Sequence, residues 1–181
     1  MWLAMWLACS SSVEAPKLDT PAAVEKAPSA EKTPAKPAEA KAGKASMEAY
    51  RKLATQLVTS IDEEAAPRKV TRDAERLTLL GVSLLEDVRA KHPACGPYFD
   101  AIIKVAPTLG DMPLDRIEKG FHSDGELPKS PDAACYHGKD LVVHPATVVA
   151  LSKAGMDTPK GRLQAKREIT EVLGHLTAVE H

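Results

Sequence analysis

Three histidines, an aspartate and a cysteine carry most of the chemistry that this sequence offers. Four of these residues fall within ten positions of one another in the stretch AACYHGKDLVVHPATVVAL, and the third histidine comes shortly before it. Imidazole nitrogens and carboxylate oxygens are the donors that bind transition-metal ions such as Zn²⁺. The candidate ligands for a metal ion or a small molecule are therefore His122, His137, Asp140 and His144.

The spacing of the histidines argues against one metal ion bound along a single helix. His137, Asp140 and His144 follow steps of three and four, which would place them on one face of a helix. Two helical turns would still separate the two histidines by about 10 Å along the axis. A joint site therefore requires the chain to fold back on itself. The alternative, which the sequence favours, is structural: histidines that bond backbone carbonyls or cap a helix in a proline-rich loop.

Motifs of common catalytic and cofactor sites are missing from the sequence. It contains no GxSxG, no HExxH, no paired CxxC and no glycine-rich phosphate loop. Cys135 beside His137 resembles a nucleophile and its base, but a disulfide would remove that thiol. The sequence contains no CxxCH motif to attach haem covalently. A non-covalent haem would need His175 or Met47 as its axial ligand. We expect no catalytic residue and no cofactor, with a metal ion or haem as the alternative.

The first nine residues, MWLAMWLAC, are apolar and end in a small residue followed by Cys9. This segment resembles the end of a bacterial lipoprotein signal peptide, although Trp6 stands where that family usually has leucine. The resemblance implies that Cys9 carries lipid and anchors a periplasm-facing protein, with the outer membrane favoured over the inner one. The alternative is a short apolar N-terminus with an incidental cysteine.

The remaining two of the three cysteines, Cys95 and Cys135, are then candidates for a disulfide. Disulfides form and persist in oxidising compartments such as the periplasm, so the pairing agrees with the anchor. The alternative is two separate buried thiols.

Composition divides the chain into three segments. Residues 1–9 form the signal-like segment that ends in the anchor cysteine. Residues 10–45 consist mainly of Ala, Pro, Lys, Glu and Ser, and they cannot bury enough apolar surface to offset the entropy of ordering. We therefore expect a disordered linker there, followed by one folded domain over residues 46–181.

The apolar residues of the domain recur at helical spacing, which predicts an all-α fold. Residues 107–144 are rich in Pro and Gly and predict an irregular excursion, with one short helix at 113–121. A second short helix is expected from Pro145 to Gly155. The prediction is a helical bundle of about four longer helices interrupted by this excursion. The longer helices are expected at 46–65, 72–91, 97–106 and 158–179.

Charge and hydropathy exclude some classes of binding partner. The net charge is −1 and the two signs are interspersed, so no basic stripe indicates nucleic acid. The sequence contains no run of 18 apolar residues, so it predicts no membrane-spanning helix. Two functions remain: a tethered module that binds a protein or cell-wall partner, or a carrier of a metal ion, haem or small ligand. The sequence favours the non-enzymatic interaction module, and His122, His137 and His144 would form the site of a carrier.

Overall fold

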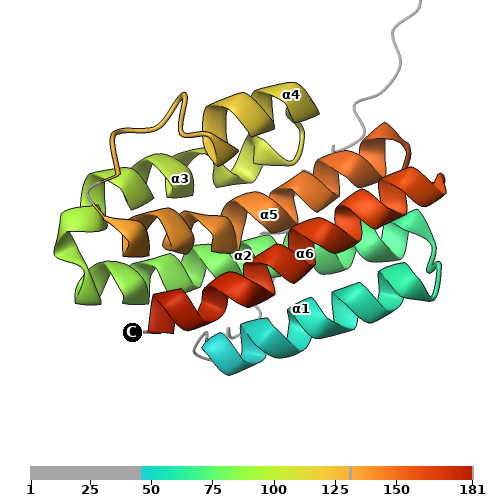
Figure 1. Cartoon of the computed structure of the whole chain (residues 1–181), viewed down its shortest axis with the longest axis horizontal. Coiled ribbons are helices and arrows are strands. Elements are labelled where there is room, and N and C mark those ends of the chain that lie inside the picture. Colours follow the sequence, from blue (N-terminus) through green and yellow to red (C-terminus); the bar gives the residue numbers. More distant parts are fainter. Residues whose placement is uncertain (1–45, 131, 181) are drawn as a thin grey trace, which may run out of the picture. The chain divides into compact units, whose positions relative to one another are not determined.

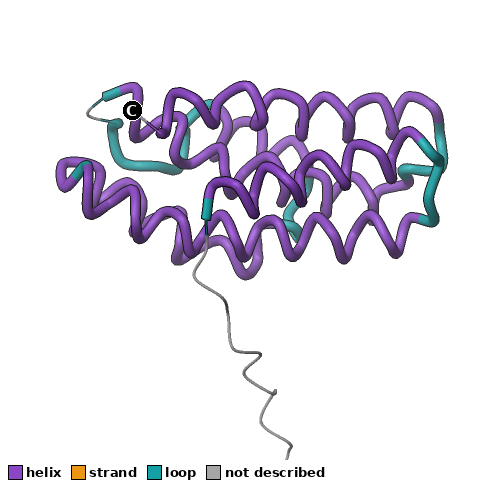
Figure 2. Tube along the Cα trace, turned by 90° about the horizontal axis from the view of Figure 1, so that it is seen from below, coloured by secondary structure: helices purple, strands orange, loops and turns teal. Residues whose placement is uncertain are grey.

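The computed structural model describes residues 46–130 and 132–180. Cys9, the signal-like segment 1–9 and the linker 10–45 lie outside these ranges. The described residues form helices joined by turns and loops, without a strand (Figure 2). The predicted all-α bundle is therefore confirmed. None of the described helices combines the length and the apolar character needed to cross a membrane.

Four long helices of the described residues form the bundle: α1 (Met47–Asp62), α2 (Pro67–Lys91), α5 (Ala133–Gly155) and α6 (Pro159–Glu180). Helix α1 packs against α2, and α5 packs against α6 (Figure 1). In addition, α1 packs against α6 and α2 packs against α5. A short connection joins α1 to α2 and another joins α5 to α6, which makes the helices of each pair antiparallel neighbours.

The chain between α2 and α5 forms shorter helical elements that lie against α5. Both α3 and α4 contact α5 (Figure 1). After the last of these elements, a loop returns the chain to the start of α5. The elements are η1 (Pro93–Cys95), α3 (Gly96–Leu109), α4 (Leu114–Ile117) and the π-helical turn η2 (Glu118–His122).

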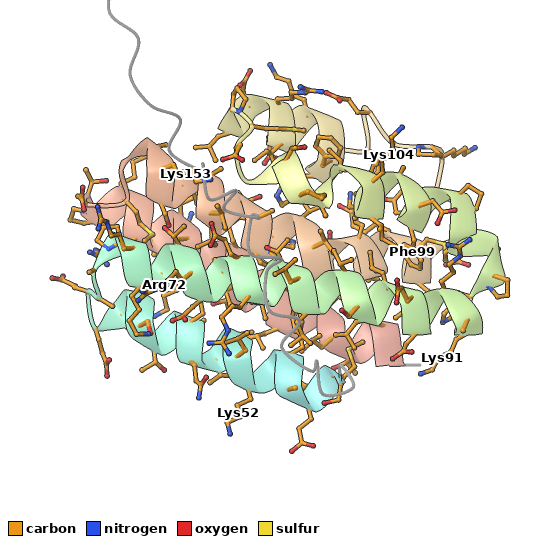
Figure 3. The ribbon with its side chains drawn as sticks, turned by 180° about the vertical axis from the view of Figure 1, so that it is seen from behind. Lys52, Arg72, Lys91, Phe99, Lys104 and Lys153 are labelled. Carbon is orange, nitrogen blue, oxygen red and sulfur yellow. A yellow bond between two sulfur atoms is a disulfide. The ribbon has the colours of Figure 1, made fainter. Side chains whose placement is uncertain are left out.

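Local sequence explains where the first helices begin. Ser46 caps α1, because its hydroxyl accepts a hydrogen bond from the Ala49 N–H at 3.1 Å. The prediction that α2 starts after Thr71 is wrong, since the helix begins at Pro67. Proline suits the first turn of a helix, where its missing N–H would have no partner. The first helices keep their polar faces outward, and the labelled Lys52 and Lys91 point away from the bundle (Figure 3).

Helix α5 is the largest departure from the prediction. It runs without a break from Ala133 to Gly155, so residues 133–144 are helical and Pro145 lies inside the helix. Every residue from 138 to 151 is buried, because α5 contacts α2, α3, α4 and α6. A helix covered on all sides shows no amphipathic period. The helical pattern therefore indicates only residues 145–155 of this central helix, and the prediction that residues 133–144 are irregular is wrong.

Two neighbours explain how α5 accommodates Pro145. Proline lacks the N–H that would bond the carbonyl four residues earlier, that of Leu141. The Tyr50 hydroxyl of α1 donates to the Leu141 oxygen at 2.8 Å and replaces the missing donor. Gly81 of α2 lies against the same carbonyl, and a Cβ at this position would come within 2.1 Å of the oxygen. Glycine therefore permits the close approach of α2 and α5.

A disulfide joins Cys95 to Cys135, with 5.2 Å between their Cα atoms, as predicted. It ties η1 to the first turn of α5. The side chain of Asp132 caps this turn by accepting a hydrogen bond from the Cys135 N–H at 3.1 Å. The disulfide and the cap therefore fix the start of α5 shortly before His137.

Candidate functional site

The antiparallel packing of α5 and α6 brings ionisable side chains of the two helices together. His137 of α5 lies beside His175 of α6, and His144 lies beside Glu168. His137 and His144 are seven residues apart on α5, and Glu168 and His175 are seven residues apart on α6. Because the helices are antiparallel, the first histidine of α5 lies beside the later residue of α6. The pairs thus occupy successive levels of one helix interface, about two turns apart.

The first cluster consists of His137, Asp140 and His175. The Oδ2 atom of Asp140 lies 2.7 Å from His175 Nδ1 and 3.9 Å from His137 Nδ1. All three atoms lie within 4.8 Å of one another. Ligands at about 2.1 Å from a tetrahedral metal ion are about 3.4 Å apart, so the two measured separations bracket the spacing that a bound ion requires.

The three ligand atoms of the first cluster are buried, and none of them forms a hydrogen bond with another residue that the structure describes. His175 Nδ1 and Asp140 Oδ2 lie at ion-pair distance, 2.7 Å, but without the orientation of a hydrogen bond. A buried polar atom without a partner costs about 1–3 kcal/mol, and native proteins keep few of them. Three such atoms within 4.8 Å of one another therefore distinguish this cluster from an ordinary buried polar contact.

The second cluster consists of His122, His144 and Glu168. Both imidazoles approach the same carboxylate oxygen: Glu168 Oε2 lies 2.8 Å from His144 Nδ1 and 3.5 Å from His122 Nε2. The three ligand atoms again lie within 4.8 Å of one another. Each cluster therefore offers two imidazole nitrogens and one carboxylate oxygen.

Asp140 links the two clusters. Its Oδ1 atom lies 3.8 Å from His144 Nε2, on the side of the imidazole opposite Glu168. The rings also form a continuous row, because the His144 centroid lies 4.8 Å from that of His122 and 5.8 Å from that of His175. Four histidines and two carboxylates thus form one continuous polar network in the bundle.

Burial shifts the pKa values of two residues in this polar network. Burial raises the pKa of Asp140, while the neighbouring histidines, His144 first, lower it in part. Burial lowers the pKa of His122, and His144 adds to this effect against the opposing pull of Glu168. Within residues 46–130 and 132–180, no Lys or Arg forms an ion pair with Asp140 or Glu168. Histidines are therefore the ionisable side chains that contact both carboxylates.

Lys139 holds His122 in place. Its fully buried ammonium donates to the carbonyl oxygens of Phe121 and His122 at 2.7 and 2.6 Å, and it pairs with Asp124. The Tyr98 hydroxyl donates to the same aspartate at 2.7 Å, and burial together with this bond raises the pKa of Tyr98. The end of η2 is thereby fastened to α5.

The structure brings the four predicted ligands into one region but divides them between two clusters. His137 and Asp140 belong to the first cluster, whereas His122 and His144 belong to the second, in agreement with the distance expected along a helix. The loop context predicted for His137 and His144 is wrong, because both lie on α5.

Glu168 is not among the predicted site residues, and His175 is considered only as a haem ligand. His175 lies at the border of the buried face of α6, with 32% of its side chain exposed. The available signal was the shared spacing of seven between His137 and His144 and between Glu168 and His175. This spacing indicates two facing pairs only when residues 133–144 are known to be helical.

A third group of potential ligands is explained by the fold itself. Cys95, Asp132 and Cys135 lie close together, but the cysteines form the disulfide and the aspartate caps α5. Comparison of the chain with protein-family models, with curated proteins and with solved structures gives no match.

Proposed function

We propose that this domain binds a divalent transition-metal ion through the first cluster, His137, Asp140 and His175. The observation that carries the proposal is that three buried ligand atoms lie within 4.8 Å of one another and form no hydrogen bond with any described residue. Two imidazoles and one carboxylate suit Zn²⁺, Cu²⁺, Ni²⁺ or Fe²⁺ better than Mg²⁺ or Ca²⁺. Three protein ligands leave a coordination position for water or for an exchangeable ligand.

The exposure of the cluster supports reversible binding, as in a metal carrier. Asp140 is almost fully buried, with 2% of its side chain exposed, whereas His137 and His175 expose 28% and 32%. An ion can therefore reach the ligand atoms past the two imidazoles and then lose most of its contact with solvent.

An extracytoplasmic location belongs to the same proposal. The Cys95–Cys135 disulfide supports an oxidising compartment, and the lipoprotein-like segment around Cys9 provides the anchor. The tethered interaction module favoured by the sequence stays a prediction. It is compatible with metal binding, because a flexible linker would let a carrier reach a partner that accepts the ion.

Metal titration of the full chain tests the proposal. All variants carry Cys9→Ser, which removes the one thiol outside the disulfide, and are stripped with a chelator before titration with Co²⁺. We expect the visible absorption of protein-bound Co²⁺ in the parent chain. His175→Ala and His137→Ala should each weaken binding at the first cluster, because each removes one of its three protein ligands.

His92→Ala is the matched control, since His92 is the residue directly after α2 and belongs to neither cluster. It should bind Co²⁺ as the parent chain does. Equal Co²⁺ binding and equal spectra in the parent chain, His175→Ala and His137→Ala would show that the first cluster binds no metal ion.

A further inference from the structure

A second set of ligands lies beside the proposed metal site and has the same composition. In the second cluster, His144 and His122 converge on one oxygen of Glu168, at 2.8 and 3.5 Å. The side chains are held by three different elements, α5, α6 and η2. Their separations bracket the spacing of about 3.4 Å between ligands of a tetrahedral ion, as in the first cluster.

The surroundings position the side chains of the second cluster. The Thr147 hydroxyl donates to the Val143 carbonyl at 2.9 Å, so in the metal-free chain it accepts a hydrogen bond from His122 Nε2 at 3.0 Å. Binding of an ion by this nitrogen requires its proton to move to Nδ1, and the ion then replaces the bond to Thr147. The Lys139 ammonium holds the backbone of His122 by donating to its carbonyl oxygen. The His122 imidazole therefore exchanges one partner for the other while its backbone stays in place.

Asp140 connects this second set to the first. When His144 Nδ1 binds an ion together with Glu168, the ring proton resides on Nε2, which faces Asp140 Oδ1 at 3.8 Å. A shift of about 1 Å brings the two atoms to hydrogen-bond distance. A carboxylate that accepts this proton orients the imidazole and makes it a stronger ligand. The same carboxylate offers its other oxygen, Oδ2, to the first cluster.

We propose that His122, His144 and Glu168 bind a second divalent transition-metal ion, and that Asp140 couples the two sites. Asp140 is a ligand of the first ion and the hydrogen-bond partner of a ligand of the second. The coupling rests on the proposed metal site at the first cluster, whereas occupancy of the second cluster does not. The domain therefore holds a pair of neighbouring ions, each bound by two imidazoles and one carboxylate.

Zinc stoichiometry separates the two sites. The full chain with Cys9→Ser is dialysed against Zn²⁺ and its metal content is measured by elemental analysis. We expect two ions per chain, falling to one in Glu168→Gln and to one in His175→Ala. His122→Gln repeats the test of the second site with a residue on η2, outside the four-helix bundle, in case Glu168→Gln does not fold. His92→Gln should retain two ions.

Asp140→Asn tests the coupling. It removes the first site, as His175→Ala does, but it also removes the carboxylate that orients His144. The remaining site in Asp140→Asn should bind Zn²⁺ about 10- to 100-fold more weakly than the remaining site in His175→Ala, which is the effect expected for losing an outer hydrogen-bond partner. Equal affinities in the two variants would overturn the coupling.

Cu²⁺ electron paramagnetic resonance reports whether the ions are neighbours. The parent chain loaded with two Cu²⁺ ions should show a signal broadened by dipolar interaction, and Glu168→Gln and His175→Ala should each show the sharper signal of an isolated ion. Unchanged stoichiometry in both Glu168→Gln and His122→Gln, whether the parent chain holds one ion or two, would overturn the second site. Loss of an ion in these two variants with none lost in His175→Ala would instead reject the first site and keep the second.

Discussion

Tyr50→Phe tests the contact that allows Pro145 to stand inside the central helix. The substitution keeps the ring and removes the hydroxyl that donates to the Leu141 carbonyl at 2.8 Å. Tyr50 and Leu141 are both fully buried, so water cannot replace the lost donor. Restoring a backbone N–H with Pro145→Ala gives the same carbonyl an alternative partner, because residue 145 lies four positions after Leu141.

The expected effect depends on the background. With proline at 145, Tyr50→Phe leaves a buried carbonyl without a donor and should lower the free energy of unfolding by about 1–3 kcal/mol. With alanine at 145, the same substitution should cost less than about 1 kcal/mol, because the helix now provides the hydrogen bond. The difference is an interaction energy of about 1–2 kcal/mol between two residues that share one acceptor.

Urea denaturation followed by far-ultraviolet circular dichroism measures this double-mutant cycle. Chelator is present, so that metal binding does not contribute, and the disulfide is intact. With a slope of about 2 kcal/mol/M, a loss of 2 kcal/mol lowers the midpoint by about 1 M. Tyr136→Phe is the control, because Tyr136 is 40% exposed and its hydroxyl lies 3.4 Å from its acceptor. We expect it to change stability by less than about 0.5 kcal/mol.

An equal cost of Tyr50→Phe in both backgrounds would refute this reasoning. It would mean that the hydroxyl does not substitute for the N–H that Pro145 lacks. The result also bears on the metal sites, since Leu141 follows Asp140 directly and precedes His144 by less than one turn.

Three further predictions concern the disulfide, Lys139 and His122. Replacing both Cys95 and Cys135 by alanine should lower the free energy of unfolding by about 3–5 kcal/mol, because the bond closes a separation of 40 residues; urea midpoints unchanged from those of the oxidised parent chain would contradict this. Lys139→Met should cost about 3 kcal/mol, near the lower end of the range for breaking a buried ion pair because Asp124 is partly exposed, and circular dichroism melts compare it with Lys52→Met, an exposed control. The lowered pKa of His122 makes the unfolded chain bind a proton more readily than the folded chain, so this contribution to stability is present above about pH 6.5 and is lost as the pH falls below it. In chelator, His122→Gln should therefore lose less stability than the parent chain between pH 7 and 5.5, and an identical loss in urea titrations would argue against a neutral His122 in the folded state.

The sequence predicts the outer helices well because each has one buried face. In α1, residues such as Tyr50 and Leu57 recur at helical spacing and are buried in the structure. The disulfide could also be predicted, since counting cysteines left a single pair in the domain. These features depend on local pattern or simple arithmetic, which one sequence contains.

The first half of the central helix and two of the six residues of the candidate site, Glu168 and His175, could not be assigned in this way. Helix α5 is buried on all sides, so its pattern lacks a period, and Pro145 indicates a helix start that the Tyr50 contact overrides. Glu168 reads as an ordinary charged residue of an amphipathic helix until α5 is placed against α6. The signal for both clusters is therefore a tertiary register, which becomes visible only after both helices are recognised.

All six proposed ligands of the two clusters come from residue 122 onward, and each cluster includes one side chain from α6, which follows the other described helices. A growing or partly translocated chain has neither site until α6 has docked on α5. Uptake of the proposed ions would accordingly report the docking of α6. A chain that crossed a membrane in unfolded form would acquire its metal only at its destination.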